Sequence, residues 1–353
     1  MAMATRVTTT WATRPTRPTR ERETRTTARV AARASTSTGA STGADDFATL
    51  ESLIAVDDER AAVALAESSP SLPAFGRGKG VPKRSYTLEE LRLNKIDTRE
   101  FLAPEDSTLD DVRNKLQVAA LAGACAAYAT HAMPTSALVG NVVGLAFFLT
   151  ADQIANAGGI EALLVDSAAR VLSPTYAKRV ALHEAGHFLV AYLTGFLPKS
   201  YTLSSLDAFL SSRRLNVQAG TTFCDASFQE EIASGKLKSS SLDVYSCVAL
   251  AGVATEWLRF GRAEGGLADI NQLDNLMRGL GFTQKKADDQ VRFAVLNTVT
   301  LLRTHTGAHD ALADAMMAGK GVAACIRAIE ERVDASTLQR EEGPAGLERE
   351  DDE

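Results

Sequence analysis

Two histidines and a glutamate within residues 183–187 have types and a spacing that could support catalysis. His183 and His187 lie four residues apart, so on a helix both imidazoles project from one face and can bind one zinc ion. Glu184 directly follows the first histidine, where its carboxylate can take a proton from a zinc-bound water. An amphipathic helix with two surface histidines is the alternative. The motif predicts hydrolysis at a zinc centre, with Glu184 as the general base.

A catalytic zinc site also needs a third protein ligand and an open position for water. Two acids further along the chain are candidates. Glu256 belongs to an apolar helix expected over residues 248–260, and Asp269 opens the helix that follows. Without further context, either acid could instead be a helix cap or a solvated charge. The remaining downstream pair of histidines, His305 and His309, is expected to be structural.

The helix that must carry the zinc motif is expected over residues 176–197. Apolar residues recur through it at helical spacing, no proline lies inside it, and Gly195 and Pro198 mark its end. A small pair of strands is expected near residues 215–223. The fold class that we predict is therefore mainly α, with one small β-strand pair.

Several segments, taken in order, resemble the peptidase domain of FtsH-type zinc metalloproteases. The matching segments are residues 183–187 (the HEAGH of that family), 216–222 (the strand beside its cleft), 249–256 (an apolar helix), 265–269 (the segment of its aspartate ligand) and 311–317 (its C-terminal helices). The resemblance implies a zincin-like helical peptidase domain over residues 160–335. It assigns zinc to His183, His187 and Asp269, catalysis to Glu184, and a supporting or alternative-ligand role to Glu256.

A closer resemblance is to the FtsH-like proteins of plant and algal chloroplasts that lack the ATPase module. Residues 86–91, 107–109 and 281–288 are similar to typical segments of those proteins. No Gly-x4-Gly-Lys-Ser/Thr segment occurs in the chain, so we expect no nucleotide site and no cofactor besides zinc. The resemblance implies a chloroplast location, protein or peptide substrates, and assembly as a homo-oligomer or with FtsH complexes.

Residues 1–44 have the composition of an organellar transit peptide, rich in Thr, Ala, Arg and Ser and poor in acids. They hold eight of the 38 Lys and Arg but only two of the 44 Asp and Glu, which leaves 30 basic and 42 acidic residues in the remainder. Nonspecific nucleic-acid binding needs clustered basic side chains, so the acidic remainder argues against a nucleic-acid partner. An ordinary disordered tail is the alternative for residues 1–44.

Residues 45–115 are expected to form an N-terminal helical region. It contains an amphipathic helix over residues 46–67, then a linker over 68–84 that is rich in Ser, Pro and Gly. A capping box at Thr87 opens a short helix after the linker. At the other end of the chain, residues 336–353 are expected to form an acidic disordered tail.

Residues 116–150 contain no Asp, Glu, Lys or Arg and are divided by Pro134. Each half is shorter than the roughly 20 residues that span a bilayer. Three arrangements fit this pattern: a membrane hairpin or re-entrant pair, one kinked span, or a buried helical pair. We expect a helical, membrane-associated segment that precedes the peptidase domain.

The expected function is that of a zinc-dependent metalloendopeptidase, a hydrolase that cleaves peptide bonds with a Glu-activated, zinc-bound water. Since no ATPase precedes the peptidase, the expected substrates are unfolded segments and peptides. One alternative is a catalytically silent zinc-binding structural or regulatory subunit. Another is a membrane adaptor of chloroplast protease complexes.

Overall fold

The computed structural model describes residues 43–97, 101, 103–104, 107–130, 134–215 and 218–339. This part of the chain is mainly helical, as predicted, with one two-stranded antiparallel sheet. The expected transit peptide lies outside the described residues except for its last two positions, which begin a helix. The expected acidic tail lies outside them beyond Gln339.

Two helices, α2 (Gly43–Ala55) and α3 (Glu59–Ser68), begin the described chain. The prediction of one continuous helix over residues 46–67 is wrong. Asp57 adopts a left-handed backbone with φ of 64°, and the Asp58 side chain caps α3 by accepting a hydrogen bond from the backbone of Ala61. Aspartates favour such turns and caps because their short carboxylates compete for backbone N–H groups.

The segment expected to be a linker is packed against the body. Leu72 and Phe75 are buried, and the backbone N–H groups of Gly76 and Gly78 donate to the carbonyls of Tyr192 and Leu193. A Cβ at Gly78 would lie 2.8 Å from the Cβ of Leu193, so only glycine allows this close approach. The Ser/Pro/Gly composition therefore reflects a tightly packed irregular segment rather than a linker.

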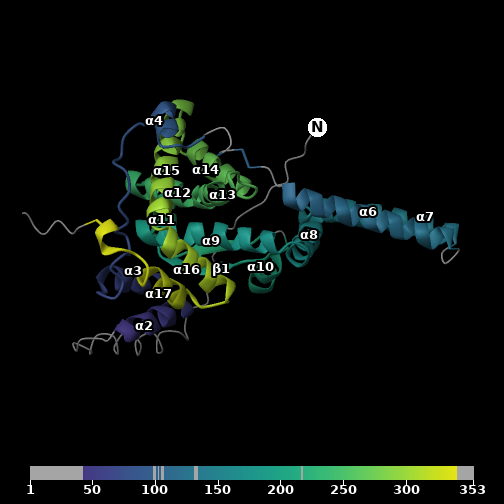
Figure 1. Cartoon of the computed structure of the whole chain (residues 1–353), viewed down its shortest axis with the longest axis horizontal. Coiled ribbons are helices and arrows are strands. Elements are labelled where there is room, and N and C mark those ends of the chain that lie inside the picture. The colour runs from purple at the N-terminus through teal and green to yellow at the C-terminus, as the bar shows by residue number, and fades with distance from the viewer. Residues whose placement is uncertain are drawn as a thin grey trace, which may run out of the picture.

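The central helix of the body is α9 (Pro174–Thr194). Ser173 caps its start, Pro174 occupies its first turn, and Gly195 ends it with φ of 90°. Its middle is buried on all sides, which explains why it reads as apolar with little amphipathicity. Five helices pack around it (Figure 1). These are α8 (Gly159–Leu172), α12 (Ser239–Ala249), α13 (Ala251–Phe260), α15 (Gln284–Thr304) and α16 (Thr306–Met317).

The sheet consists of β1 (Pro198–Thr202) and β2 (Gly220–Phe223), which pair antiparallel with Tyr201 opposite Thr221. The prediction of a strand pair near residues 215–223 is right for β2 only. Its partner, β1, directly follows α9. The alternation of polar and apolar residues in β1 is too short to identify it as a strand from the sequence. Two short helices follow the strands: α10 (Ser205–Ser212) comes after β1, and α11 (Ala226–Ala233) comes after β2.

The remaining helices of the body are α4 (Leu88–Leu93), α14 (Leu267–Gly279), α17 (Val322–Glu330) and the short 3-10 turn η1 (Ala335–Thr337). The capping box predicted at Thr87 is present, with Glu90 as its partner. The helix expected over residues 248–260 is interrupted at Leu250, where α12 ends and α13 begins. Both helices pack against α9.

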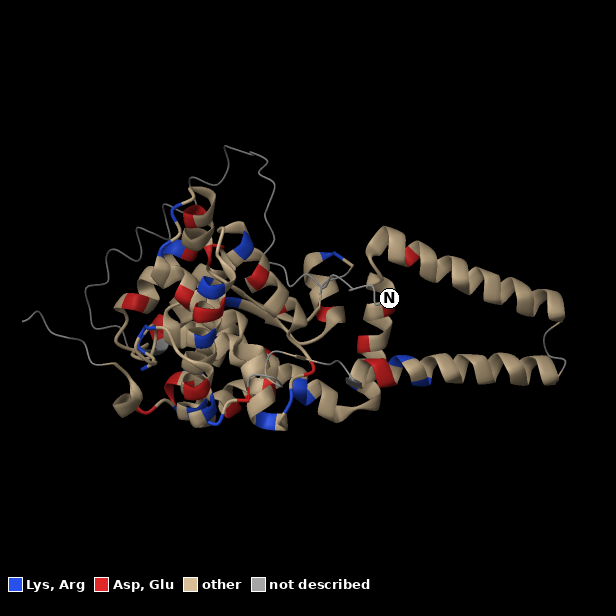
Figure 2. Ribbon diagram, turned by 90° about the horizontal axis from the view of Figure 1, so that it is seen from above, with Lys and Arg blue, Asp and Glu red and all other residues tan. Residues whose placement is uncertain are grey.

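Two long helices, α6 (Ser107–Ala129) and α7 (Thr135–Asn156), run side by side and project from the body as a hairpin (Figures 1 and 2). Pro134 precedes α7, as the sequence suggested. The arrangement as a buried helical pair is wrong, because large hydrophobic side chains such as Val143 and Phe147 are exposed. Among the described helices, α7 alone has the length and mean hydropathy, 1.5, to cross a membrane.

The base of the hairpin is tied to α8. Asp152 is buried near the end of α7 and accepts hydrogen bonds from the backbone N–H groups of Ile160 and Glu161, at 3.1 and 3.0 Å. Arg113 of α6 donates to the Glu161 carboxylate at 2.9 Å. Because α8 also packs against α9, the hairpin is attached to the helix that carries His183 and His187.

Candidate metal centre

His183, His187 and Asp269 meet in space and could hold a metal ion. The two Nε2 atoms lie 3.1 Å apart, and each lies 3.4 Å from Asp269 Oδ2. Ligand atoms that surround zinc tetrahedrally at about 2.0–2.1 Å are separated by about 3.3 Å. The three atoms therefore have the separations of three ligands of one ion, and two imidazoles with a carboxylate are a donor set that suits zinc.

Hydrogen bonds to the other ring nitrogens fix how the two imidazoles face. His183 Nδ1 lies 2.7 Å from Glu256 Oε1, and His187 Nδ1 lies 2.7 Å from the carbonyl oxygen of Val248. Both partners are acceptors, so each ring donates from Nδ1 and directs its Nε2 lone pair toward the other ring. Two lone pairs at 3.1 Å repel each other unless a cation, either a metal ion or a shared proton, lies between them.

Small residues let α13 approach the motif closely. A Cβ at Gly186 would lie 2.2 Å from the hydroxyl oxygen of Thr255, and one at Gly252 would lie 2.1 Å from His183 Nε2. Glycine at both positions therefore leaves room for the α9–α13 contact and for the imidazole. On the other side, Gly266 precedes α14 with φ of 92°, which places Asp269 in the first turn of that helix.

Glu256 lies outside the three-residue metal group and supports it instead. Besides His183, its carboxylate accepts hydrogen bonds from Arg179 at 2.9 Å and from the backbone N–H of Glu264 at 2.8 Å. Burial would raise the pKa of Glu256, but His183 and these donors outweigh it and lower the pKa to about 2. Both carboxylate oxygens are thus committed, which leaves Glu256 the role of orienting His183.

Glu184 is buried beside the metal group without belonging to it. Thr221 of β2 donates a hydrogen bond to its carboxylate, with 2.9 Å between Thr221 Oγ1 and Glu184 Oε2. Burial raises the pKa of Glu184, while the two histidines and the Thr221 hydroxyl act to lower it. A carboxylate with a raised pKa, held next to a metal group, is suited to accept a proton.

The charges of the metal group are strongly coupled. Burial would lower the pKa of His183 and of His187, but Asp269 raises both, and Glu256 adds to the effect on His183. Burial would raise the pKa of Asp269, yet the two imidazoles lower it below its ordinary value. In the absence of a metal, the carboxylates therefore favour protonated imidazoles. Either protons or a metal ion can supply the positive charge that balances these carboxylates.

The metal group is shielded from solvent. The exposed fraction is 8% for His183, His187 and Asp269, and 5% for Glu184. A pocket of about 600 Å³ lies elsewhere, along β1, and none of these four residues lines it. His305 and His309 are also buried but stand apart from the metal group, with His309 Nε2 2.9 Å from the carbonyl oxygen of Leu182.

Two supporting residues have no distinct signal in the sequence. The sequence around Thr221 predicts only a strand. Its hydroxyl reaches Glu184 because β2 packs beside α9. Arg179 lies one helical turn before His183 and reaches Glu256 across 77 positions of sequence. A basic residue on a helix is ordinarily solvated, so only the fold reveals this ion pair.

Comparisons with models of protein families, with curated proteins and with solved structures find no match for this chain. The site is therefore defined by its own geometry. That geometry defines a buried group of two imidazoles and one carboxylate that can hold a divalent ion, with a glutamate close to it.

Proposed function

We propose that the chain is a zinc-dependent metalloendopeptidase. His183, His187 and Asp269 would hold the zinc ion, and Glu184 would be the general base. The observation that supports this assignment best is the convergence of two oriented Nε2 atoms and a carboxylate beside a buried glutamate that is not a ligand. The resemblance to FtsH-type peptidases supports the same assignment from the sequence.

Each residue has a separate task in this proposal. A bound zinc ion would supply an electrophile that polarises the peptide carbonyl and makes water more acidic. Glu184 accepts the proton of the attacking water and passes it to the leaving amine. Thr221 holds the Glu184 carboxylate in place, and Glu256 holds the His183 ring. The Nδ1–H of His187 is held by the Val248 carbonyl.

The proposed substrates are unfolded segments or peptides, since the sequence contains no ATPase motif that could drive unfolding. The composition of residues 1–44 supports targeting to an organelle, and the resemblance supports a chloroplast as that organelle. The resemblance also supports assembly as a homo-oligomer or with FtsH complexes.

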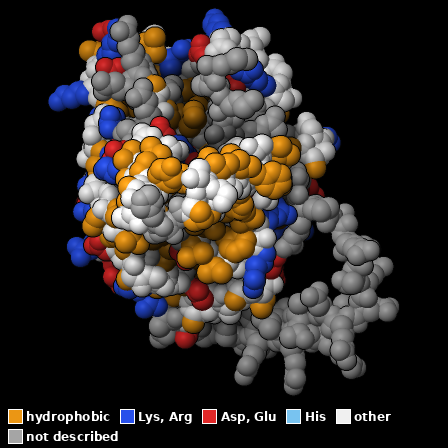
Figure 3. All heavy atoms as spheres, turned by 90° about the vertical axis from the view of Figure 1, so that its right-hand side faces the viewer, with side chains coloured by type: hydrophobic (Ala, Val, Ile, Leu, Met, Phe, Trp, Pro, Cys, Tyr) orange, Lys and Arg blue, Asp and Glu red, His pale blue; other side chains and the backbone are white. Residues whose placement is uncertain are grey.

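The hairpin of α6 and α7 supports association of the protein with a membrane. The large side chains along α7 are exposed and apolar, and the charged residues of α6 gather at its base (Figures 2 and 3). A helix of 22 residues is about 33 Å long, which matches a hydrocarbon core of about 30 Å. We propose that the hairpin inserts into the bilayer while the metal centre stays outside it.

A silent zinc-binding subunit is the second candidate, and the burial of the metal group favours it. Structural zinc sites are closed, whereas catalytic sites keep a position for water. The two functions differ in the role of Glu184, which a structural site does not need.

Cleavage of casein by the full chain with zinc, in detergent, tests the proposal. Glu184→Gln should retain zinc and lose turnover by about 100-fold or more, because it removes the general base. Glu89→Gln, a change at an exposed glutamate of α4, is the matched control and should cleave as the unaltered chain does. Equal cleavage by the Glu184 variant would refute the peptidase. Zinc binding without cleavage by the unaltered chain would favour the silent subunit.

A further inference from the structure

The loop between α13 and α14 joins the metal centre to the base of the hairpin. Glu264 lies in this loop and is buried, with an exposed fraction of 7%. Its backbone N–H donates to Glu256, the residue that orients His183. Its carboxylate accepts a hydrogen bond from the Thr108 hydroxyl, with 2.5 Å between Thr108 Oγ1 and Glu264 Oε2. Thr108 belongs to the first turn of α6, so the contacts of this loop reach from the metal centre to the hairpin.

Arg179 connects the two buried carboxylates. Its Nη1 donates to Glu256 at 2.9 Å, and its Nη2 lies 3.4 Å from Glu264 Oε1. Its guanidinium also lies over the ring of Phe260, 4.2 Å from the ring centroid, which restricts its position. Because one guanidinium contacts both carboxylates, a change in the position of Glu264 alters the hydrogen bond that Arg179 gives to Glu256.

The Thr108 hydroxyl contacts a different oxygen of Glu264 from the arginines. Arg179 and Arg262 each lie 3.4 Å from Oε1, whereas Thr108 donates to Oε2. A buried carboxylate oxygen that loses a donor turns toward another donor or toward water, because leaving a hydrogen bond unmade in the interior is costly. Removal of the hydroxyl would therefore move the Glu264 carboxylate relative to Arg179.

The same loop leads directly to the third residue of the metal group. Gly266 ends the loop with φ of 92°, and Asp269 lies in the first turn of α14. A Cβ at Gly265 would lie 2.8 Å from Glu256 Oε1, so this part of the loop is packed against the orienting carboxylate. The position of the loop therefore affects the metal group at two points, the orienting glutamate and Asp269.

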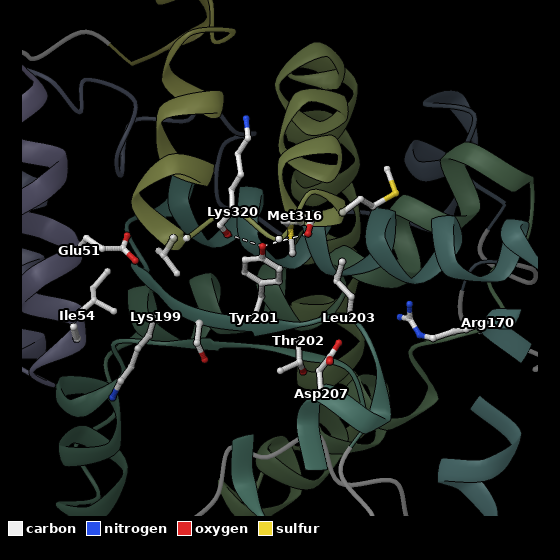
Figure 4. Close-up of a pocket in the computed structure, with 16 residues that line it drawn as sticks. Glu51, Ile54, Arg170, Lys199, Tyr201, Thr202, Leu203, Asp207, Met316 and Lys320 are labelled. Carbon is white, nitrogen blue, oxygen red and sulfur yellow. Dashed lines mark hydrogen bonds between the residues drawn. The ribbon is translucent and has the colours of Figure 1, made fainter. Parts of the chain in front are cut away.

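We propose that Thr108 and Glu264 are positioning residues of the metal centre. The Thr108 hydroxyl holds the Glu264 carboxylate. Glu264 in turn holds Arg179 and the carboxylate that orients His183. The inference rests on the proposed zinc site and deepens it, because the base of the hairpin becomes one of the elements that set the affinity for zinc. Other residues line the pocket along β1, which has no part in this arrangement (Figure 4).

Titration with zinc in competition with a chelator tests the proposal on the full chain in detergent. Thr108→Val should lower zinc affinity about three- to tenfold, less than a residue that bonds directly to a ligand. Thr108→Ser keeps the hydroxyl and should restore the affinity of the unaltered chain. Thr150→Val should leave the affinity unchanged and is the matched control, because the Thr150 hydroxyl of α7 donates to the carbonyl of Ala146 in its own helix.

Two further measurements separate positioning from general destabilisation. When Thr108→Val is combined with Glu256→Gln, the loss of affinity should be smaller than the product of the two separate losses, because both changes act on the orientation of His183. With cobalt(II) bound in place of zinc, the visible absorption spectrum reports the geometry of the ligands. We expect this spectrum to shift in Thr108→Val and to stay unchanged in Thr150→Val.

Glu264→Gln tests the next residue inward and serves as the second variant if Thr108→Val folds poorly. It removes the charge that Arg179 contacts, and it should lower zinc affinity at least as much as Thr108→Val. Unaltered affinity in both variants, or losses that multiply in the combined variant, would overturn the proposal. Failure of the chain to cleave casein would leave this test intact. Failure of the unaltered chain to bind zinc or cobalt would refute the metal site and this inference together.

Discussion

Glu256 Oε1 lies 2.7 Å from Nδ1 of His183, although the two residues are 73 positions apart in the sequence. The contact joins α13 to α9 and directs the other nitrogen of the ring toward His187 and Asp269. Arg179 and the backbone of Glu264 hold the carboxylate from its other side. The metal group is therefore positioned by a chain of hydrogen bonds and not by the spacing of the histidines alone.

Removing the charge of Glu256 should weaken metal binding without removing a ligand. We expect Glu256→Gln to lower zinc affinity about 10- to 100-fold, since residues that orient metal-bound histidines have effects of this size. Titration of the protein with zinc in competition with a chelator measures the change. Asp274→Asn, an exposed carboxylate of α14, is the control, and an unaltered affinity in the Glu256 variant would contradict the orienting role.

Removing the Asp269 carboxylate should weaken zinc binding more than removing the charge of Glu256. Asp269→Ala removes a carboxylate oxygen that lies 3.4 Å from both Nε2 atoms, so the loss of zinc affinity should exceed the roughly 100-fold upper limit expected for an orienting residue. Metal analysis of the purified variant, with Asp274→Asn alongside, gives the answer. If the Asp269 variant kept its zinc while Glu256→Gln lost it, Glu256 would be the third ligand instead.

The hydrogen bond from Thr221 should affect the pH above which Glu184 is deprotonated. The Thr221 hydroxyl lowers the pKa of that carboxyl by donating to it, so Thr221→Val should raise the Glu184 pKa. A general base must be deprotonated, so the acid limb of the pH–activity profile should move to higher pH by the same amount. Thr222→Val, at the next residue of β2 with an exposed side chain, should leave the limb in place. If the acid limb lay at the same pH in Thr221→Val and in Thr222→Val, Thr221 would not control the pKa of Glu184.

Zinc affinity should fall as the pH falls. The decrease should begin at a higher pH than it would for histidines with ordinary pKa values. In the metal-free protein Asp269 and Glu256 raise the histidine pKa values above 6.5, so zinc must displace bound protons at neutral pH. Calorimetry in buffers of different ionisation enthalpy measures the protons released per zinc. Between pH 8 and pH 6, Asp269→Asn should release fewer protons than the unaltered protein, and an equal number would contradict the coupling.

The hairpin should hold the protein on lipid vesicles. Phe147→Arg places a charge on an exposed apolar position of α7, and we expect it to reduce flotation with vesicles, because a charged side chain within the bilayer costs about 2.5–3.5 kcal/mol. Val171→Arg is the matched control, since Val171 is exposed and apolar but belongs to α8 in the body. Equal flotation of both variants would argue against insertion of α7.

Local patterns in the sequence were enough to predict the helix of the zinc motif, the capping box at Thr87 and the division of the apolar stretch at Pro134. These features depend on spacing and on capping residues within a few positions of each other, and such interactions are visible in a linear chain. The same logic failed over residues 46–67, where Asp57 and Asp58 broke a helix that apolar spacing alone would continue. It failed again over residues 68–84, where composition suggested a linker but the glycines pack against α9.

The sequence by itself determined that two imidazoles would share a helix face and that a glutamate would lie next to them, because one helical turn fixes both. Residue chemistry alone left Asp269 and Glu256 equivalent, and the family resemblance favoured Asp269 as the ligand. The tertiary structure brought Asp269 to the two imidazoles and Glu256 to Nδ1 of His183. It also brought Thr221 to Glu184 and Arg179 to Glu256. Those relationships depend on how helices and strands pack across long separations, and no local spacing records them.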